Sequence, residues 1–582
     1  MIHGGQTGVQ FAKGGKLENA GTISGLTGIA VNGAATIDNA GTIAASAGGN
    51  AISLKGGASS VTLETGSVIG GAIAGNGTAS TITLAGHGSL SSDITGLQAG
   101  QVNIQQNAVW TVSGNWAAGQ VVNAGTLTAG LVGTPLTIEG NYTQTSTGTL
   151  RVVVAPQGMS HLAVTGTAHL AGTLAYLLSP GTYQPGNYSF LTAAGGVSGD
   201  FATVQASNAS QYNRSPSGTA GSSPAGVVSI TAAQTPASPT MPPALVLAVR
   251  QAVVVAPADG AVFTDAGQAL ALSGAASGQA LLARADGQAA APCSAPAAMA
   301  GQATGAENVA AALAGGLCGM GGWVQATGSD LSTDGAYDAR GGGFLAGLDR
   351  PVGPGRIGIA VGYDALNLKD EADSKAFLGT VRLGLYGGLN WGPAVLSTEV
   401  MDGLVNTTTT RATGAGAAAA NGHGNVLSAS FQAAFAFSAG GGVFGPAAGV
   451  EITHFFLGGL TEAAATQAMA AQASAASGTY VAPYLRLTAT RDFITAHGLE
   501  ISPSATLGLT VNATNPGASV TMTARDGTTF NIAPLQLSPV AGEAGVGLGI
   551  GRGNWRLSVR YAATLAGNWH AQSLEGGLLV RF

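Results

Sequence analysis

Side chains that could carry out hydrolysis are scattered through the N-terminal half of the chain, with no partner at motif spacing. Gly199-Asp200 is followed by Phe201, where a hydrolase motif would place a nucleophilic serine. No HExxH motif and no calcium-binding nonapeptide occur. The sequence therefore predicts a protein without enzymatic activity, metal site or cofactor. We interpret the isolated histidines as polar residues of solenoid rungs or turns: His3, His87, His161 and His169.

The two cysteines are Cys293 and Cys318. Neither has a metal ligand at zinc spacing, which argues against a zinc site. A scarcity of cysteine suits the oxidising cell envelope, where stray thiols are a liability. The pair either forms one disulfide or remains two small, unlinked residues.

Length and composition indicate a large β-protein with more than one domain. A chain of 582 residues is too long for a single core. Only 8% of the residues are charged and 94 are glycine, but the glycine has no collagen period. The net charge of -6 argues against a nucleic-acid partner.

No segment is predicted to be a transmembrane helix, which needs ~20 apolar residues. The most apolar candidate, residues 244–255, is interrupted by Arg250 and Gln251. The residues after Met1 do not form a basic region followed by an apolar core, as a secretory signal would. We therefore expect the N-terminus to be truncated or misassigned.

A repeat of about 20 residues runs through the N-terminal half. The segment Asn19-Ala20-Gly21-Thr22-Ile23 recurs as Asn39-Ala40-Gly41-Thr42-Ile43. Such a period, with short β-segments between Gly and Asn turns, is typical of a parallel solenoid. Stacking would place Ile23 over Ile43 in an internal column. A β-sandwich with Gly-rich turns is the alternative.

The repeat units lengthen from about residue 138, and large apolar residues such as Tyr142, Leu174 and Phe190 become frequent. This predicts a cap that closes the solenoid. Between residues 236 and 320, Ala, Gly, Pro and Ser dominate. We interpret this region as a linker, with one short helix at residues 307–313.

The C-terminal half predicts an antiparallel barrel of about twelve strands. In one segment Ile357, Ile359 and Val361 share a face, while the opposite face is small or polar. A soluble sandwich shows the same alternation, but closure into a barrel removes exposed strand edges. Aromatic residues that we assign to interfacial girdles support the membrane: Trp323, Tyr363, Tyr386, Trp391 and Tyr561.

Charged residues of the predicted strands would face a water-filled lumen and pair there. The sequence does not predict which pairs form. The arginines are Arg382, Arg486, Arg556 and Arg560, and the acidic residues are Glu399, Glu451, Glu500 and Glu543.

The last strand also predicts contact with lipid. Leu574 and Leu578 fall on one face and Glu575 on the other. The end of the strand resembles the insertion signal of outer-membrane barrels, which Gly577, Val580 and Phe582 match. Gly576 departs from that signal, since a polar residue stands at this place in it.

The whole C-terminal half resembles the autotransporter β-domain of type V secretion. Residues 140–204 are similar to the autochaperone region that precedes such barrels, although Ser160 and His161 stand where an acidic residue is common. The N-terminal repeats look like a passenger β-helix. The segments that carry the resemblance are Gly322-Trp323-Val324-Gln325, residues 343–349, Gly355-Arg356-Ile357-Gly358, Val361-Gly362-Tyr363, Leu385-Tyr386-Gly387, Pro483-Tyr484-Leu485 and Phe582.

The resemblance implies a fold, a cellular location and a pathway of membrane insertion. The fold would be a right-handed parallel β-helix followed by a 12-stranded transmembrane barrel with a linker helix in the pore. The place would be the bacterial outer membrane, with the passenger at the cell surface. Insertion would need outer-membrane lipid, the barrel-assembly machinery and periplasmic chaperones. Some relatives cleave themselves between paired asparagines, but this chain has no Asn-Asn pair, so we expect the passenger to stay attached.

The predicted function is translocation and display of the chain's own passenger by a monomer, with the passenger serving as an adhesin for a host or cell-surface ligand. The predicted domains are a passenger solenoid at residues 1–137, a cap at 138–235, a linker at 236–318 and a barrel at 319–582. One alternative is the remnant of a larger autotransporter whose enzymatic module lay upstream of Met1. Another is a soluble secreted β-protein.

Overall fold

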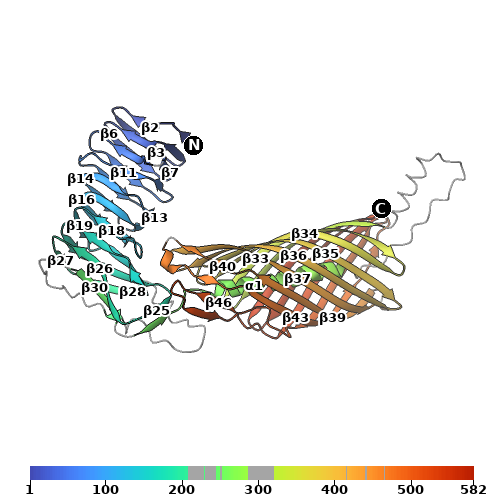
Figure 1. Cartoon of the computed structure of the whole chain (residues 1–582). Coiled ribbons are helices and arrows are strands. Elements are labelled where there is room, and N and C mark those ends of the chain that lie inside the picture. Colours follow the sequence, from blue (N-terminus) through green and yellow to red (C-terminus); the bar gives the residue numbers. More distant parts are fainter. Residues whose placement is uncertain are drawn as a thin grey trace.

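The computed structural model contains two elongated β-units joined by a linker (Figure 1). It describes residues 1–46, 48–206, 228–229, 244–249, 252–285, 320–414, 416–439, 442–464 and 466–581. The N-terminal unit is a β-solenoid of about eight turns, and the C-terminal unit is a 12-stranded antiparallel barrel. The predicted all-β fold class is therefore confirmed.

Parallel strands from successive turns stack into three ladders that form the solenoid walls. The first ladder contains β2 (Thr7–Phe11), β5 (Thr27–Val31), β8 (Asn50–Leu54), β11 (Ala72–Ala74), β14 (Ile94–Ile104), β16 (Gly114–Asn123), β18 (Leu136–Ile138), β22 (Leu162–Val164) and β26 (Gly186–Ala193). The second contains β3 (Gly14–Asn19), β6 (Ala34–Asn39), β9 (Ser60–Leu63), β12 (Thr81–Leu84), the second halves of β14 and β16, β19 (Asn141–Gln144), β23 (Ala168–Leu170) and β27 (Val197–Gly199). The third contains β1 (Ile2–His3), β4 (Thr22–Gly25), β7 (Thr42–Ala45), β10 (Val68–Gly70), β13 (His87–Leu90), β15 (Val109–Val112), β17 (Thr126–Ala129), β20 (Thr149–Ala155), β24 (Thr173–Leu178) and β28 (Thr203–Ala206).

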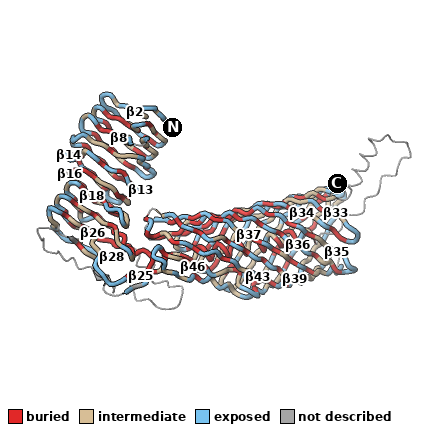
Figure 2. The backbone as a smooth tube through the Cα atoms, in the orientation of Figure 1, coloured by how far each residue is buried: buried red, intermediate tan, exposed pale blue. Residues whose placement is uncertain are grey.

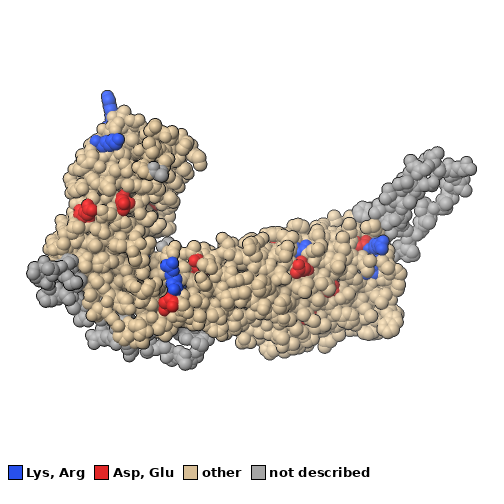
Figure 3. Space-filling view, viewed as in Figure 1, with Lys and Arg blue, Asp and Glu red and all other residues tan. Residues whose placement is uncertain are grey.

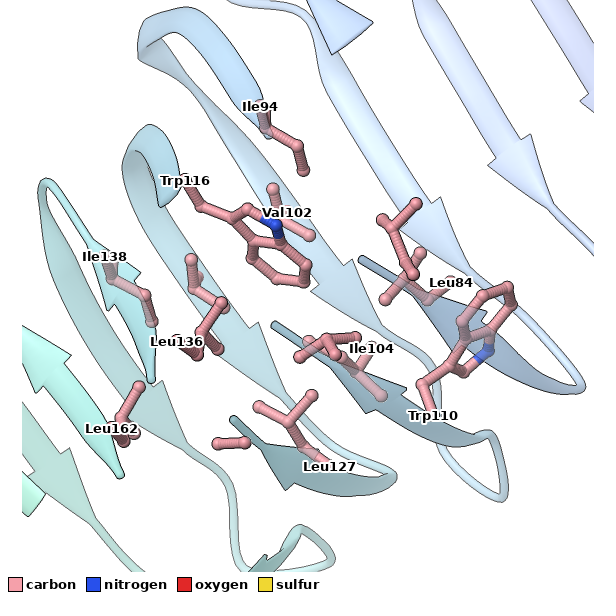
Figure 4. Close-up of a cluster of buried hydrophobic side chains, with 14 of the residues drawn as sticks. Leu84, Ile94, Val102, Ile104, Trp110, Trp116, Leu127, Leu136, Ile138 and Leu162 are labelled. Atoms are coloured by element: carbon pink, nitrogen blue, oxygen red, sulfur yellow. The ribbon is translucent and has the colours of Figure 1, made fainter. Parts of the chain in front are cut away.

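The solenoid core is a continuous apolar column. Ile23 of β4 is paired in register with Ile43 of β7, and both are buried, as the 20-residue repeat predicts. At the repeated asparagines, Asn19 Nδ2 donates a 2.7 Å hydrogen bond to Asn39 Oδ1. Farther along, the fully buried side chain of Trp116 fills the column (Figure 4). Its indole nitrogen donates to the carbonyl oxygen of Ser92 at 3.3 Å.

Antiparallel strands end the parallel stack. The strand β30 (Ala244–Val249) pairs antiparallel with β26 and with β29 (Val228–Ser229). Next, β31 (Val253–Val255) pairs antiparallel with β25 (Gly181–Tyr183). A short hairpin strand, β21 (Gly158–Met159), pairs with β20. The region that was interpreted as linker therefore contributes strands to the end of the solenoid.

The barrel closes through hydrogen bonds between its first and last strands, β32 and β50. It uses twelve long strands: β32 (Gly321–Thr333), β33 (Tyr337–Val352), β34 (Gly355–Asp370), β35 (Lys375–Trp391), β36 (Ala394–Ala412), β37 (Ala417–Phe435), β39 (Gly442–Leu457), β43 (Ala476–Thr490), β45 (Glu500–Val511), β48 (Val540–Arg552), β49 (Trp555–Ala566) and β50 (Trp569–Arg581). Shorter strands extend the wall at its ends: β38 (Phe437–Ala439), β41 (Ala463–Ala464) and β44 (Phe493–Ile494).

The outer face of the barrel is apolar and exposed. Ile359, Val361 and Leu383 expose 54%, 55% and 62% of their surface. Buried and exposed stretches alternate along the strands, as the period-two pattern predicts (Figure 2). Charged side chains are sparse on the visible face (Figure 3). This outer band is the surface that a bilayer would cover.

Two of the five residues assigned to aromatic girdles lie elsewhere. Trp323 and Tyr386 are buried inside the barrel, where Trp323 Nε1 donates a 2.7 Å hydrogen bond to Tyr386 Oη. Their assignment to a girdle is wrong because their strand positions place them on the inner face. Tyr363, Trp391 and Tyr561 are exposed on the outside.

One long helix, α1 (Ala261–Ala285), lies inside the barrel (Figure 1). A helix in the pore was predicted, but at residues 307–313, and residues 261–285 were interpreted as part of the linker that precedes it. The short helix predicted at residues 307–313 lies outside the described residues. A second sheet covers the pore at the solenoid end, formed by β40 (Leu460–Thr461), β42 (Gln472–Ala473), β46 (Val520–Thr523) and β47 (Thr529–Ile532).

Candidate functional site: the occupied lumen

The chain enters the barrel through a tight turn at the solenoid end. Asp259, just before α1, has a left-handed backbone with φ of 52°. Its carboxylate accepts a hydrogen bond from the Ser374 hydroxyl group. The guanidinium group of Arg411 donates to the carbonyl oxygen of Ala258 at 2.6 Å. The polar groups of this turn are thus hydrogen-bonded to β36 and to the turn that precedes β35.

Near its N-terminus α1 is fixed through Gln268, which is fully buried. Its amide nitrogen donates to Asn515 Oδ1 at 3.1 Å and to the carbonyl oxygen of Leu535 at 2.9 Å. Its amide oxygen accepts a 3.1 Å bond from the Tyr337 hydroxyl group. Apolar side chains of α1, the wall and the covering sheet surround these bonds in one buried cluster.

In the middle of the lumen, charged wall residues hold polar side chains of α1. Ser273 donates to Asp364 Oδ2 at 3.2 Å, and Asp364 forms an ion pair with Arg382. One turn and a half later, Gln279 donates to Glu451 Oε2 at 3.3 Å and accepts a hydrogen bond from Arg486. The inward-facing charges therefore position the helix by direct contact.

A third set of contacts fixes the last turn of α1. Arg284 Nη2 lies 2.6 Å from Asp349 Oδ2, and the Asp349 side chain is 2% exposed. The Tyr386 hydroxyl group donates to the same oxygen at 2.8 Å, and Arg356 lies 3.5 Å from Asp349 Oδ1. A buried carboxylate needs such partners, because burying an unpaired charge is costly.

Glycines allow α1 to approach the wall closely. A Cβ atom at Gly267 would lie 2.8 Å from the Phe455 ring, and one at Gly274 would lie 2.7 Å from Val426 Cγ2. A Cβ at Gly278 would lie 2.6 Å from Glu399 Oε1. At Gly267 and Gly274 the neighbours are an aromatic ring and branched side chains packed in the wall, which have little room to move aside, so these two positions of α1 need glycine.

The helix does not fill the lumen. It packs against β34 to β37, β39 and β43. A cavity of about 360 Å³ separates its last turns from β48, β49 and β50. Its lining mixes polar and charged residues, among them Ser504, Arg560 and Glu575, with apolar residues such as Trp323 and Leu579. The barrel thus encloses a wall-bound helix and an open space beside it.

The structure determines the pairing of the predicted lumen charges. Arg486 and Arg560 both bind Glu543, at 2.8 and 3.0 Å, and Arg556 lies 2.9 Å from Glu500. The remaining arginine, Arg382, pairs with Asp364, which was not among the expected partners. Glu399 accepts a 2.9 Å bond from Ser430, and Glu451 binds Gln279.

The terminal strand has the predicted orientation. Leu574 and Leu578 are exposed, whereas Glu575 accepts a 3.1 Å bond from Gln325 on the inner face. Gly577 and Val580 lie within β50 and pair with β32. Phe582, Cys293 and Cys318 lie outside the described residues, so the insertion signal and the disulfide stay predictions.

The remaining polar candidates lie in the solenoid. The ring of His161 is hydrogen-bonded to the carbonyl oxygen of Ser189 and the hydroxyl group of Thr192, at 3.1 and 3.0 Å. Across the described ranges, no three His, Cys, Asp or Glu side chains gather as metal ligands would. Within the same ranges, no helix combines the length and apolarity needed to cross a bilayer.

A comparison with known protein families identifies the family of the barrel. Residues 320–562 match the family model of the autotransporter beta-domain. The barrel is an autotransporter β-domain. No curated protein matches the chain.

Solved autotransporter structures resemble this chain at low sequence identity. The translocator domain of NalP from Neisseria meningitidis is 14% identical, with a TM-score of 0.42, and the match covers 56% of this chain and 100% of that one. The β-domain of BrkA from Bordetella is 18% identical over 45% of this chain and 99% of that one, with a TM-score of 0.35. The transport unit of AIDA-I from Escherichia coli is 15% identical over 45% and 90%, with a TM-score of 0.32.

The protein is thus an autotransporter with a β-helical passenger and a translocator barrel. The β-domain lies in the bacterial outer membrane, with the passenger at the cell surface. The solenoid end of the barrel is therefore extracellular, and the end that holds Arg284 and Asp349 is periplasmic.

Proposed function

We propose that the barrel inserts into the outer membrane and translocates its own solenoid to the cell surface, where the passenger stays attached. One observation carries this proposal: α1, which directly follows the last passenger strands, lies inside the lumen and is bonded to its wall. A chain that runs from an external solenoid through the pore has the connectivity expected after translocation.

The proposal extends to the partners of assembly. Insertion needs lipid, the barrel-assembly machinery and periplasmic chaperones, with the end of β50 as the recognised signal. Because β32 pairs with β50, the closed barrel has no free edge strand, which favours a monomer. We also propose the domain boundaries 1–137, 138–235, 236–318 and 319–582, in which the third segment connects the two units and contains the closing strands β30 and β31 and the helix α1.

We further propose that the displayed solenoid acts in adhesion and not in catalysis. Its walls are regular ladders of short strands, and charged side chains are few on the face in Figure 3. Repetitive walls of this kind offer extended binding surfaces. Adhesion of cells that display the chain, compared with cells that display the barrel alone, measures this role.

Protease access on intact cells tests translocation. An epitope inserted at the exposed turn of Gly133 should be removed by external protease, while a periplasmic marker survives. Removing Phe582 should lower the amount of heat-modifiable barrel and of surface epitope together. An epitope that stays protected in wild-type cells with a folded barrel would overturn the proposal.

A further inference from the structure

The outer face of the barrel carries a groove above two of its periplasmic turns. Exposed apolar side chains form one row across four adjacent strands in register: Leu348 of β33, Ile359 of β34, Leu385 of β35 and Val400 of β36. The next row toward the periplasm contains Arg350, Ile357, Gly387 and Thr398. Because Gly387 has no side chain, the second row has a gap that the first row lacks.

The gap opens toward the lipid that surrounds the barrel. A Cβ atom at Gly387 would lie 3.2 Å from the carbonyl oxygen of Arg356 and 3.7 Å from Ile357 Cγ2, and apart from its neighbours in the chain no other atom lies within 4 Å. The groove has a volume of about 620 Å³, which is within the range of small-molecule sites, roughly 300–1,000 Å³. The apolar row, Ile357 and Met320 line it. Its size and lining suit a hydrocarbon chain.

The groove lies at the depth of the periplasmic leaflet. The turns at Gly353 and Gly392 join β33 to β34 and β35 to β36 at the periplasmic end of the barrel. Beside the second turn, Trp391 exposes 74% of its surface, and exposed tryptophan prefers the level of the lipid headgroups. The row of Arg350 is the closer of the two rows to these turns. It therefore lies nearer the headgroups, and the apolar row lies nearer the acyl chains.

Arg350 brings a positive charge without a protein partner to the rim of the groove. Its side chain is exposed and forms no ion pair or hydrogen bond with any residue that the structure describes. The adjacent carboxylate of Asp349 points to the lumen, where it binds Arg284. On the outer face near the extracellular end, by contrast, Arg340 is paired with Asp330. A guanidinium group at headgroup depth is well suited to phosphate, because its N–H groups match the phosphate oxygens.

We propose that this groove binds one phospholipid of the periplasmic leaflet, with an acyl chain over Gly387 and the phosphate group on the Arg350 guanidinium group. A phospholipid supplies both an apolar chain and a negative charge, which the two parts of the site require together. A peptide segment fits less well, because it would bring unsatisfied backbone polar groups into the apolar groove. The site lies outside the lumen, and the inference does not depend on translocation.

Native mass spectrometry of the full chain in detergent tests the site. Titration with phosphatidylglycerol should show one lipid that binds more tightly than the others. Gly387→Leu, which fills the groove, and Arg350→Gln, which removes the charge, should each lower the affinity for this lipid about tenfold, as expected for the loss of one charge-assisted or well-packed contact. A diacylglycerol with the same chains lacks the phosphate group and should bind the wild type about tenfold more weakly. Equally tight binding of diacylglycerol and phosphatidylglycerol would overturn the proposal.

Two control variants change the outer surface away from the groove. Ala544→Leu adds an apolar side chain to the exposed face of β48, and Arg491→Gln removes an exposed arginine just after β43, at the periplasmic end. Both should keep the wild-type affinity, and all four variants should keep the heat-modifiable barrel band. An equal loss of affinity in Arg491→Gln, or wild-type affinity in both groove variants, would refute the site.

Thermal stability supplies an independent readout. A ligand that binds only the folded barrel raises the unfolding midpoint as its concentration rises. Phosphatidylglycerol should therefore raise the temperature at which the wild type loses its heat-modifiable band, and the rise should be smaller in Gly387→Leu and Arg350→Gln. An equal rise in these variants and in the wild type would show that the lipid acts on the barrel surface as a whole, which would contradict a single site.

Discussion

At the scale of single residues, the lumen stabilises its charges through partners on the wall and on α1. Asp349 contacts Arg284, Arg356 and Tyr386 within one buried group. Such a group is costly to break, because removing one partner leaves a buried charge without compensation. Exposed ion pairs behave differently, since water screens them.

Arg411 forms a fully buried ion pair with Glu462, which should contribute strongly to the stability of the barrel. Arg411→Met should lower the free energy of unfolding of the barrel by about 3–5 kcal/mol, because it leaves the buried carboxylate of Glu462 unpaired. Urea unfolding in detergent measures the change. Arg340→Met is the matched control, since the exposed Arg340–Asp330 pair contributes only ~0–1 kcal/mol. Equal losses in the two variants would contradict this account of the buried pair.

The sequence predicts that these charges face inward but not how they pair. Alternation along a strand determines the face of Arg382 or Arg486. Pairing depends on which strands are adjacent and on where α1 lies, and neither follows from local pattern. Thus Asp364 of β34, one strand away from Arg382, became its partner. The positions of aromatic residues are still harder to predict from sequence, because Trp323 and Tyr386 could lie either at the membrane interface or in the lumen.

At the scale of elements, α1 is held by shape as much as by charge. Its glycines lie against side chains of β36, β37 and β39, while Ala276 on the other side is exposed to the lumen. The glycine side of α1 is closely packed, so a larger side chain there has no room. On the Ala276 side, a larger side chain can extend into the open lumen.

Two matched variants test this asymmetry. Gly274→Leu should displace α1 and raise single-channel conductance in planar bilayers, because its side chain would overlap Val426 and Thr453. Ala276→Leu should leave conductance at or below the wild-type level, since that side chain extends into the open lumen. Equal conductance in the two variants would show that close packing does not hold the helix.

The helix was missed because the wall surrounds it. A helix at a protein surface shows one apolar stripe, and that periodicity is the usual signal. Here every residue from Val262 to Ala271 is buried, including Asp265 and Gln268, so buried apolar and polar residues occur on every face. Alanine and glycine then resemble linker composition. The solenoid strands, by contrast, repeat every 20 residues and were predicted from Ile23 and Ile43.

At the scale of the whole molecule, the solenoid and the barrel have separate apolar cores. They are joined by the entry turn and by a small apolar cluster in which Val153 and Leu177 of the solenoid pack with Met469 of the barrel. Damage inside one core should therefore leave the other folded. Trp116 fills the solenoid column, so its replacement should damage the solenoid core alone.

Trp116→Ala should destabilise the solenoid by about 3–5 kcal/mol, through lost burial and the cavity it leaves. The heat-modifiable barrel band should not change. Calorimetry of the full chain in detergent, with gel mobility as the barrel readout, measures both. Val109→Ala, at a half-exposed position of β15, is the control and should change stability by less than ~0.5 kcal/mol. A parallel loss of barrel stability would show that the two cores are coupled.

The contact between the units should depend on pH through Asp526, which lies in an extracellular turn. Burial alone raises the pKa of this carboxyl group, but the amide groups of Thr182 and Thr528 that donate to it outweigh burial and hold its pKa below the ordinary value. A lowered pKa means that the contact is stable above the unfolded value of ~3.9 and is lost as pH falls through the lowered value. The hydrogen-exchange protection factor of the Thr182 amide should therefore fall below pH ~4. In Asp526→Asn, the protection factor of the Thr182 amide should be lower than in the wild type and should not vary with pH. A wild-type protection factor that stays constant from neutral to acid pH would exclude the carboxylate as the acceptor that holds the passenger.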